Sequence, residues 1–303
     1  MALLLSVLEQ GMIYGILALG VYITYKILDF PDLTVDGSFP FGAAITVRLI
    51  NGFGVPAILT LPIAFLGGAL VGICTGLIHV KLKVRDLLSG IIMMTGLYTI
   101  NLWVAGSGYV AIFDKENIFN NSFVNSITPG FLVNFKNVII IFLITMVAKY
   151  LLDWYMSTKS GFLLRAVGDN DTIVTSLGVD KGLVKIVGLS IANGLVSLSG
   201  CIYAQQQRSF EISIGTGAVV IGLASVIIGT SLFKKLTFVK TTTAVIIGSI
   251  LYKGCVAIAI RFFDPQSMKL ITAVLFLVIL VISMERKQKA KGMAEGQKGG
   301  KNA

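Results

Sequence analysis

Four charged side chains lie within or beside long apolar runs. Asp32 and Asp36 belong to "DFPDLTVDGSFPFG", which also holds two prolines. Glu211 belongs to "FEISIGTGAVVIG", and Lys253 belongs to "GSILYKGCVAIAI". A charge at the centre of a membrane helix costs roughly 2.5–3.5 kcal/mol, so such residues face protein or a water-filled cavity. We therefore interpret all four as candidates for lining a path. Lys253 has two interpretations: it pairs with Glu211 or an aspartate, or it extends outward to the interface.

Other chemistry is missing from the sequence. There is no G-x-x-x-x-G-K-[ST] phosphate loop, no H-E-x-x-H and no G-x-S-x-G. The single histidine, His79, and the cysteines Cys74, Cys201 and Cys255 are scattered rather than spaced as metal ligands or redox pairs. We expect no catalytic residues, no metal and no cofactor. No basic cluster alternates with stacking aromatic residues, so we also expect no nucleic-acid partner.

The charged residues are embedded in about nine apolar segments. Of 303 residues, 55% are hydrophobic and 13% are charged, about half the charged share of soluble domains. Runs of about 20 apolar residues cross a bilayer as helices, because hydrocarbon offers no hydrogen-bond partner to the backbone. The expected segments are 3–26, 34–50, 56–79, 86–105, 137–155, 186–206, 214–233, 237–260 and 268–284.

These segments predict an all-α polytopic membrane protein with about 8–9 transmembrane helices. The segments at 34–50 and 214–233 are short and rich in Gly, Ser or Thr, so each either spans fully or is broken or re-entrant. The residues that lead into the two segments, from Phe30 and from Phe210, are similar in type. This similarity indicates either that the two halves of the chain are related or only that their compositions are similar. We expect one membrane domain over 1–285 and a basic, disordered cytoplasmic tail over 286–303, with an attraction to membrane lipid.

The basic residues predict an orientation. Of the 25 lysines and arginines, 17 fall at one set of segment ends and in the tail, 6 fall at the other set, and Lys149 and Lys253 lie inside apolar runs. Cytoplasmic loops carry the excess of lysine and arginine. The larger group, which includes the loop at 156–185, is therefore predicted to be cytoplasmic.

That loop contains a polar stretch, "GFLLRAVGDNDTIVTSLGVD", at residues 161–180. A short helix is predicted from about 170 to 177, with Asp169 or Asn170 as its N-cap and Gly178 as its stop. The spacing places its apolar side chains, Ile173, Val174 and Leu177, on one face. Such a helix either docks on a cytoplasmic partner or rests on the membrane surface.

The same stretch resembles the cytoplasmic loop of branched-chain amino-acid-type ABC importer permeases. "GMIYGILALGVYITYKILDFPDLTVDGSFPFGAA" is similar to their opening span and polar break, and "GTGAVVIGLASVIIGTSLF" resembles their late segment of small residues. The order of these motifs covers most of the chain, and the subgroup often linked to aromatic amino-acid uptake is the most similar. The break departs from the family pattern, since "DFPDLTVDG" replaces the usual Asn-Phe-Ala-His-Gly run.

The resemblance implies a permease subunit in a bacterial plasma membrane. The loop would form a coupling helix that docks on a separate ATPase chain, through residues that match the family motif: Arg165, Gly168, Asp169, Asn170, Ile173, Val174, Leu177 and Gly178. A separate extracytoplasmic binding protein would deliver a small solute such as an amino acid, and a second permease copy or a sister permease would complete the path. The external loop at 106–131 either helps to dock the binding protein or only covers the bundle.

Two other classes of function compete with this interpretation. An ion-coupled secondary transporter would use Asp32, Asp36 and Glu211 as proton or sodium sites. A membrane enzyme would need a catalytic constellation, which the single histidine disfavours. Separately, Gly68, Gly72 and Gly76 recur every four residues and predict close helix contact, either within the bundle or at a dimer seam.

Overall fold

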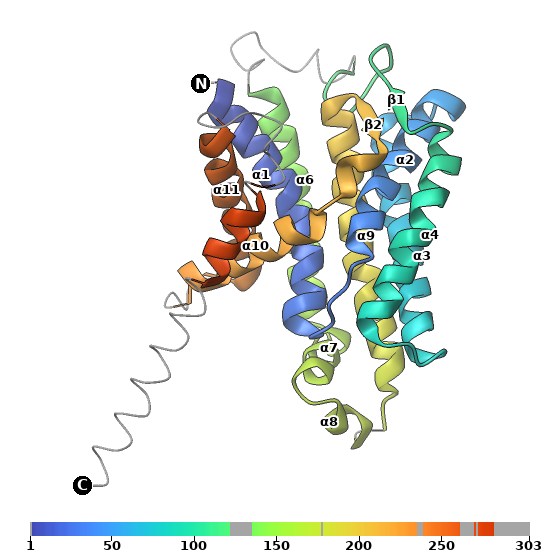
Figure 1. The fold of residues 1–303 in the computed structure, drawn as a ribbon, viewed down its shortest axis with the longest axis vertical. Coiled ribbons are helices and arrows are strands. Elements are labelled where there is room, and N and C mark those ends of the chain that lie inside the picture. The colour runs from blue at the N-terminus through green and yellow to red at the C-terminus, as the bar shows by residue number, and fades with distance from the viewer. Residues whose placement is uncertain are drawn as a thin grey trace, which may run out of the picture.

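The computed structural model shows a bundle of long helices and describes residues 2–121, 135–176, 178–234, 239–260, 270 and 272–281 (Figure 1). The long helices are α1 (Ala2–Val21), α2 (Val35–Phe53), α3 (Thr60–Val80), α4 (Asp86–Ala105), α6 (Lys136–Met156), α9 (Lys181–Gln207), α10 (Ala218–Leu232) and α11 (Thr241–Ile260). The shorter elements are η1 (Tyr22–Ile27), η2 (Ala57–Leu59), β1 (Tyr109–Ala111), α7 (Lys159–Asp169), α8 (Asp171–Ser176), β2 (Ser209–Glu211) and η4 (Ile212–Gly215). An apolar helix also covers Thr272–Val281.

The helices confirm the all-α membrane fold predicted from the apolar segments. Within the described residues, seven helices are long and apolar enough to cross a membrane. α10 reaches that length only together with η4, since its 15 residues extend about 22 Å against a hydrocarbon core of about 30 Å. α2 is less apolar than these seven because Asp36, Pro40 and Arg48 lie within it.

α1 and α9 form the centre of the bundle, and they run in opposite directions (Figure 1). Both are far more buried than α3, α4 or α6. The glycine stripe of α3 packs directly on α9: a Cβ at Gly68 or Gly72 would collide with the carbonyl oxygen of Asn193 or Leu189. These glycines therefore allow close helix contact within the bundle, which was one of the two predicted roles beside a dimer seam.

Both segments predicted to be short follow a break in the chain. η1 continues α1 to Ile27, after which residues 28–34 return toward the middle of the bundle and α2 begins at Val35. In the second half, α9 ends at Gln207, β2 and η4 return, and α10 begins at Ala218. The N-terminal ends of α2 and α10 meet inside the bundle, so the two breaks face each other.

A short two-stranded sheet lies at the end of the bundle that also carries the N-terminus (Figure 1). β1 pairs with β2 in antiparallel register, Val110 opposite Phe210. This sheet ties the segment after α4 to the end of α9, because each strand satisfies the backbone groups of the other. At the opposite end of the bundle, α7 and α8 project beyond the long helices.

Candidate functional site

Asp32 lies in the first break and is buried, with 5% of its surface exposed. Its Oδ1 accepts a hydrogen bond from the Thr34 amide at 2.9 Å, and its Oδ2 accepts one from Asn193 Nδ2 at 2.8 Å. Asn193 Oδ1 accepts in turn from Ser38 Oγ at 2.6 Å. Buried carboxylates require such partners. Both oxygens of Asp32 are thus engaged within the chain, and they fasten the break to α9.

Asp36 joins the two broken helices. Its carboxylate accepts hydrogen bonds from the amides of Gly217 at 3.0 Å and Val219 at 2.8 Å. It therefore caps the N-terminus of α10, where unpaired amides and the helix dipole favour a negative charge. A Cβ at Gly215 would collide with the Asp36 carbonyl oxygen. This carbonyl has no helical partner, because Pro40, four residues later, has no N–H. The close approach of the two breaks depends on this glycine.

Glu211 is exposed in β2, where it pairs opposite Tyr109 and accepts a hydrogen bond from Ser213. The structure places it at the sheet rather than within a span. Among the ion pairs of the described residues there is none between Glu211 and Lys253, so that proposed pairing is not formed.

Lys253 projects from α11 into a group of aromatic side chains. Its Nζ lies 3.5 Å from the ring centroid of Tyr14 on α1. Tyr14 packs on Phe39 and Tyr203, with ring centroids 5.5 and 5.9 Å away, and those two rings are 5.5 Å apart. A cation over an aromatic face is stabilised by the ring quadrupole. Neither pairing with an acid nor outward extension describes Lys253: it is held inside the bundle by Tyr14.

Glu9 is a second charged residue of this region, which the sequence interpretation missed. It lies on α1 with 9% of its surface exposed, and its Oε2 accepts a hydrogen bond from Gln206 Nε2 at 3.0 Å. Gln206 Oε1 is buried and has no partner among the described residues. The signal was present in the sequence, since "LEQGMIYG" places an acid within an apolar run.

The polar stretch at 161–180 contains parts of two helices rather than one. α7 was not predicted; its N-cap is Thr158, whose Oγ1 accepts a hydrogen bond from the Gly161 amide at 3.4 Å. Asn170 separates it from α8 and caps α8, its Oδ1 accepting from the Thr172 amide at 3.1 Å. Gly178 has a φ of +74°, a left-handed conformation that favours glycine. The N-cap and stop of the predicted helix are therefore confirmed.

The residues assigned to partner contact differ in exposure. Arg165, Asp169 and Asn170 are exposed, as a docking surface requires. Val174 has 0% of its surface exposed, so it packs within the chain and does not belong to a partner-facing set. The side chain of Ile173 and the whole of Leu177 lie outside the described residues.

Gly168 attaches the α7–α8 unit (residues 159–176) to the bundle. A Cβ at Gly168 would collide with the carbonyl oxygen of Ile27, the last residue of η1. Leu164 on the same helix is fully buried and packs on Gly188 of α9. Its Cδ1 lies 2.5 Å from the position that a Cβ at Gly188 would occupy. The unit therefore contacts the bundle directly beside the start of the first break.

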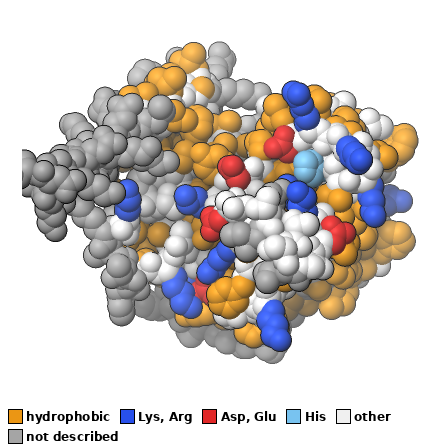
Figure 2. All heavy atoms as spheres, turned by 90° about the horizontal axis from the view of Figure 1, so that it is seen from below, with side chains coloured by type: hydrophobic (Ala, Val, Ile, Leu, Met, Phe, Trp, Pro, Cys, Tyr) orange, Lys and Arg blue, Asp and Glu red, His pale blue; other side chains and the backbone are white. Residues whose placement is uncertain are grey.

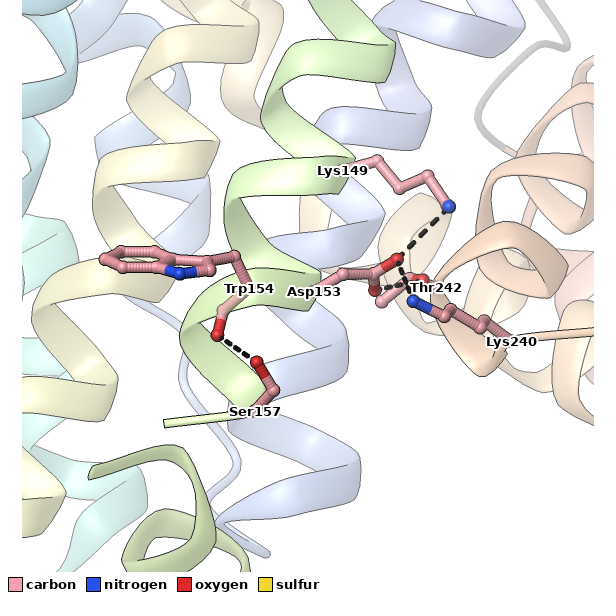
Figure 3. Close-up of polar contacts among 6 residues, drawn as sticks. All are labelled: Lys149, Asp153, Trp154, Ser157, Lys240 and Thr242. Carbon is pink, nitrogen blue, oxygen red and sulfur yellow. Dashed lines mark hydrogen bonds and ion pairs between the residues drawn. The ribbon is translucent and has the colours of Figure 1, made fainter. Parts of the chain in front are cut away.

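An ionic cluster at the same end links α6 to α11 (Figure 3). Asp153 Oδ2 lies 3.1 Å from Lys149 Nζ and 3.4 Å from Lys240 Nζ, and its Oδ1 accepts from Thr242 Oγ1 at 2.7 Å. Lys149 and Asp153 are nearly buried, whereas Lys240 is 68% exposed. The cluster explains how Lys149 is accommodated within an apolar run.

Lysine and arginine side chains are spread over the end of the molecule that carries α7 and α8, among apolar and acidic side chains (Figure 2). Lys81, Lys83 and Arg85 between α3 and α4 are exposed, as are Lys159 and Arg165. These five basic residues, all members of the larger group, thus lie at one end, which is the arrangement on which the predicted orientation depends. In the described part of the chain, no group of three His, Cys, Asp or Glu could hold a metal ion.

Comparison with known proteins gives the family. The profile described as "Branched-chain amino acid transport system / permease component" matches residues 3–284. A tyrosine transport system permease protein of Clostridioides difficile is 42% identical, over 91% of this chain and 90% of that protein. A probable branched-chain amino acid transport permease protein, LivH, of Methanocaldococcus jannaschii is 26% identical over 71% and 70%. The ribose import permease protein RbsC of Escherichia coli is 26% identical over 75% and 68%.

No solved structure matches the chain significantly. The breadth of the profile match and the 42% identity show that the chain belongs to the branched-chain amino acid permease family. It is a multi-pass permease subunit of an ABC importer in the bacterial cell membrane. The resemblance drawn from the polar stretch and the two breaks is confirmed.

Proposed function

We propose that this permease carries an amino acid or a related small solute, together with a second copy of itself or a sister permease. The relative with 42% identity is named for tyrosine transport, and a more distant one for branched-chain amino acids. A separate binding protein would deliver the solute at the end that carries β1 and β2. A separate ATP-binding-cassette ATPase would drive transport from the end that carries α7 and α8.

One observation carries the assignment of the ATPase contact. The α7–α8 unit projects from the bundle at the basic end, and Gly168 seats it on the last residue of η1. A docked ATPase would therefore push on the chain where the first break begins. The exposed residues Arg165, Asp169 and Asn170 would contact the ATPase around the apolar side chains of Ile173 and Leu177, as in helix-in-groove recognition.

The geometry does not favour the three acids that an ion-coupled carrier was expected to use. Such a carrier needs a carboxylate that is available to a proton or a sodium ion. Asp32 and Asp36 each use both oxygens for hydrogen bonds that hold the breaks together, and Glu211 is exposed at the sheet. We also propose that residues 286–303, which lie outside the described residues, form a cytoplasmic tail attracted to anionic lipid.

Purification of the tagged permease from its native membrane tests the proposal. We expect an ATP-binding-cassette ATPase to co-purify, and proteoliposomes that contain both chains and the binding protein to take up solute only with ATP. Uptake driven by a sodium or proton gradient in proteoliposomes that contain this chain alone would contradict the proposal.

A further inference from the structure

The outer half of the bundle contains a group of polar and aromatic side chains that does not belong to the α7–α8 unit or to the two breaks. We call Glu9, Tyr14, Tyr203, Gln206 and Lys253 the outer cluster. They come from three different helices, α1, α9 and α11. The cluster brings an acid, a cation and two aromatic rings together on neighbouring turns of these helices.

The packing of α1 against α11 fixes this depth. The two helices run antiparallel: a Cβ at Gly11 would lie 2.8 Å from the Cα of Ile250, and one at Gly254 would lie 3.9 Å from Val7. Lys253 is therefore held beside the turn of α1 that carries Glu9. Gln206 Nε2 reaches the same turn from α9, at 3.0 Å from Glu9 Oε2.

The cluster has unused hydrogen-bonding capacity. Lys253 forms no ion pair within the described residues, and its Nζ lies over the ring of Tyr14. The buried Oε1 of Gln206 and the buried hydroxyl of Tyr252, one residue before Lys253, also have no partner in the described part of the chain. Buried polar groups are nearly always paired, so these two atoms are available to a ligand that reaches the cluster. Tyr203, Gln206 and Lys253 each keep some exposed surface.

We propose that the outer cluster binds the transported solute and selects an α-amino acid with an aromatic side chain. The Lys253 ammonium would donate to the solute carboxylate, and the Glu9 carboxylate would accept from the solute ammonium. The rings of Tyr14 and Tyr203, backed by Phe39, would pack on the aromatic side chain. This inference rests on the proposed function and adds the site and the solute class to it.

Ligands that lack one group each can test the site on the assembled importer. The wild-type complex of permease, ATPase and any partner permease is placed in nanodiscs, and binding of L-phenylalanine, 2-phenylethylamine, 3-phenylpropionate and L-leucine is measured. We expect L-phenylalanine to bind at least about tenfold more tightly than each of the other three. Charge-assisted hydrogen bonds convert to roughly ten- to a hundredfold in affinity.

Substitutions then assign each contact. Lys253→Met should remove the preference for L-phenylalanine over 2-phenylethylamine, which lacks the carboxylate, and should leave the preference over 3-phenylpropionate. Glu9→Gln should remove the preference over 3-phenylpropionate, which lacks the ammonium, and should leave the preference over 2-phenylethylamine. Tyr203→Leu should reduce the preference over L-leucine, whereas Tyr203→Phe should keep it. Lys115→Met, at an exposed lysine outside the cluster, is the matched control and should behave as wild type.

The outcomes separate this inference from the proposed function. Equal binding of the four ligands to the wild-type complex would overturn the site even if a variant fails to fold. Loss of both preferences in parallel in every cluster variant would also overturn it, because that result indicates general damage. An importer that assembles and hydrolyses ATP but lacks these preferences would refute the site alone. A permease that captures no ATPase would refute the proposed function.

Discussion

The Asp36 carboxylate lies 2.8 Å from the amide of Val219, a residue 183 positions further along the chain. This bond joins the start of α2 to the start of α10, so the two broken helices support each other. The sequence pattern alone predicts a path residue at this position. In the structure its charge caps a helix, which accounts for a carboxylate at membrane depth without any solute.

Asp36→Ala should therefore destabilise the permease as well as lower transport. Loss of an N-cap costs about 0.5–2 kcal/mol, and the unpaired amides of Gly217 and Val219 remain inside the protein. The melting temperature in detergent, measured by differential scanning fluorimetry, should fall. Asp36→Asn keeps one acceptor oxygen, so its melting temperature should lie between those of the wild type and Asp36→Ala. An unchanged melting temperature for Asp36→Ala would show that the capping bonds contribute nothing to stability.

Asp153→Asn should destabilise the protein far more than Lys240→Met. The first change leaves the nearly buried Lys149 without its partner, and breaking a buried ion pair costs about 3–5 kcal/mol. Lys240 is 68% exposed, and exposed ion pairs contribute about 0–1 kcal/mol. Thermal unfolding of both variants in the same detergent gives the comparison. Equal losses would contradict the different burial of the two lysines.

Ile173→Ala combined with Leu177→Ala should release the ATPase while the bundle stays folded. Truncating one buried anchor commonly costs 2 kcal/mol or more, which is about thirtyfold in affinity. The measurement is recovery of the ATPase on tagged permease in detergent. Thr172→Ala, on the same helix, is the control and should keep the partner. Undiminished recovery with the double variant would support a helix that rests on lipid.

Gly168→Ala should uncouple ATP hydrolysis from transport more strongly than Gly178→Ala. A methyl group at Gly168 meets the Ile27 carbonyl oxygen, whereas one at Gly178 meets nothing within 4 Å. The cost at Gly178 comes from its positive φ alone, roughly 1–2 kcal/mol. The number of ATP molecules hydrolysed per solute transported in proteoliposomes checks this order. The reverse order would mean that the contact between Gly168 of α7 and Ile27 does not couple ATP hydrolysis to transport.

Ser160→Cys and Gly299→Cys should resist an impermeant thiol reagent on intact cells. Both positions are predicted to be cytoplasmic from the distribution of lysine and arginine. The labelling requires a variant without Cys74 and Cys255, which are exposed. Permeabilised cells provide the positive control. Strong labelling of either position on intact cells would contradict the orientation.

Features that depend on local chemistry could be predicted from the sequence. Long apolar segments must be helices in a bilayer, and the described helices match the expected segments within a few residues. The Asn170 cap and the Gly178 stop follow from side-chain and backbone properties of single residues. The stripe of Gly68, Gly72 and Gly76 predicted a close contact, although the sequence did not identify α9 as the partner.

The roles of the charged residues were decided by tertiary structure. A sequence shows that Asp32 and Asp36 are costly in hydrocarbon, but their partners, Asn193 and Val219, are more than 150 residues away. The approach of Lys253 to Tyr14 likewise joins α11 to α1, which are distant along the chain. Composition thus determined that this protein spans a membrane, because transfer energies add up over neighbouring residues. Only the fold decided which charges hold the breaks together and which do not, because that depends on pairs of groups brought together from different helices.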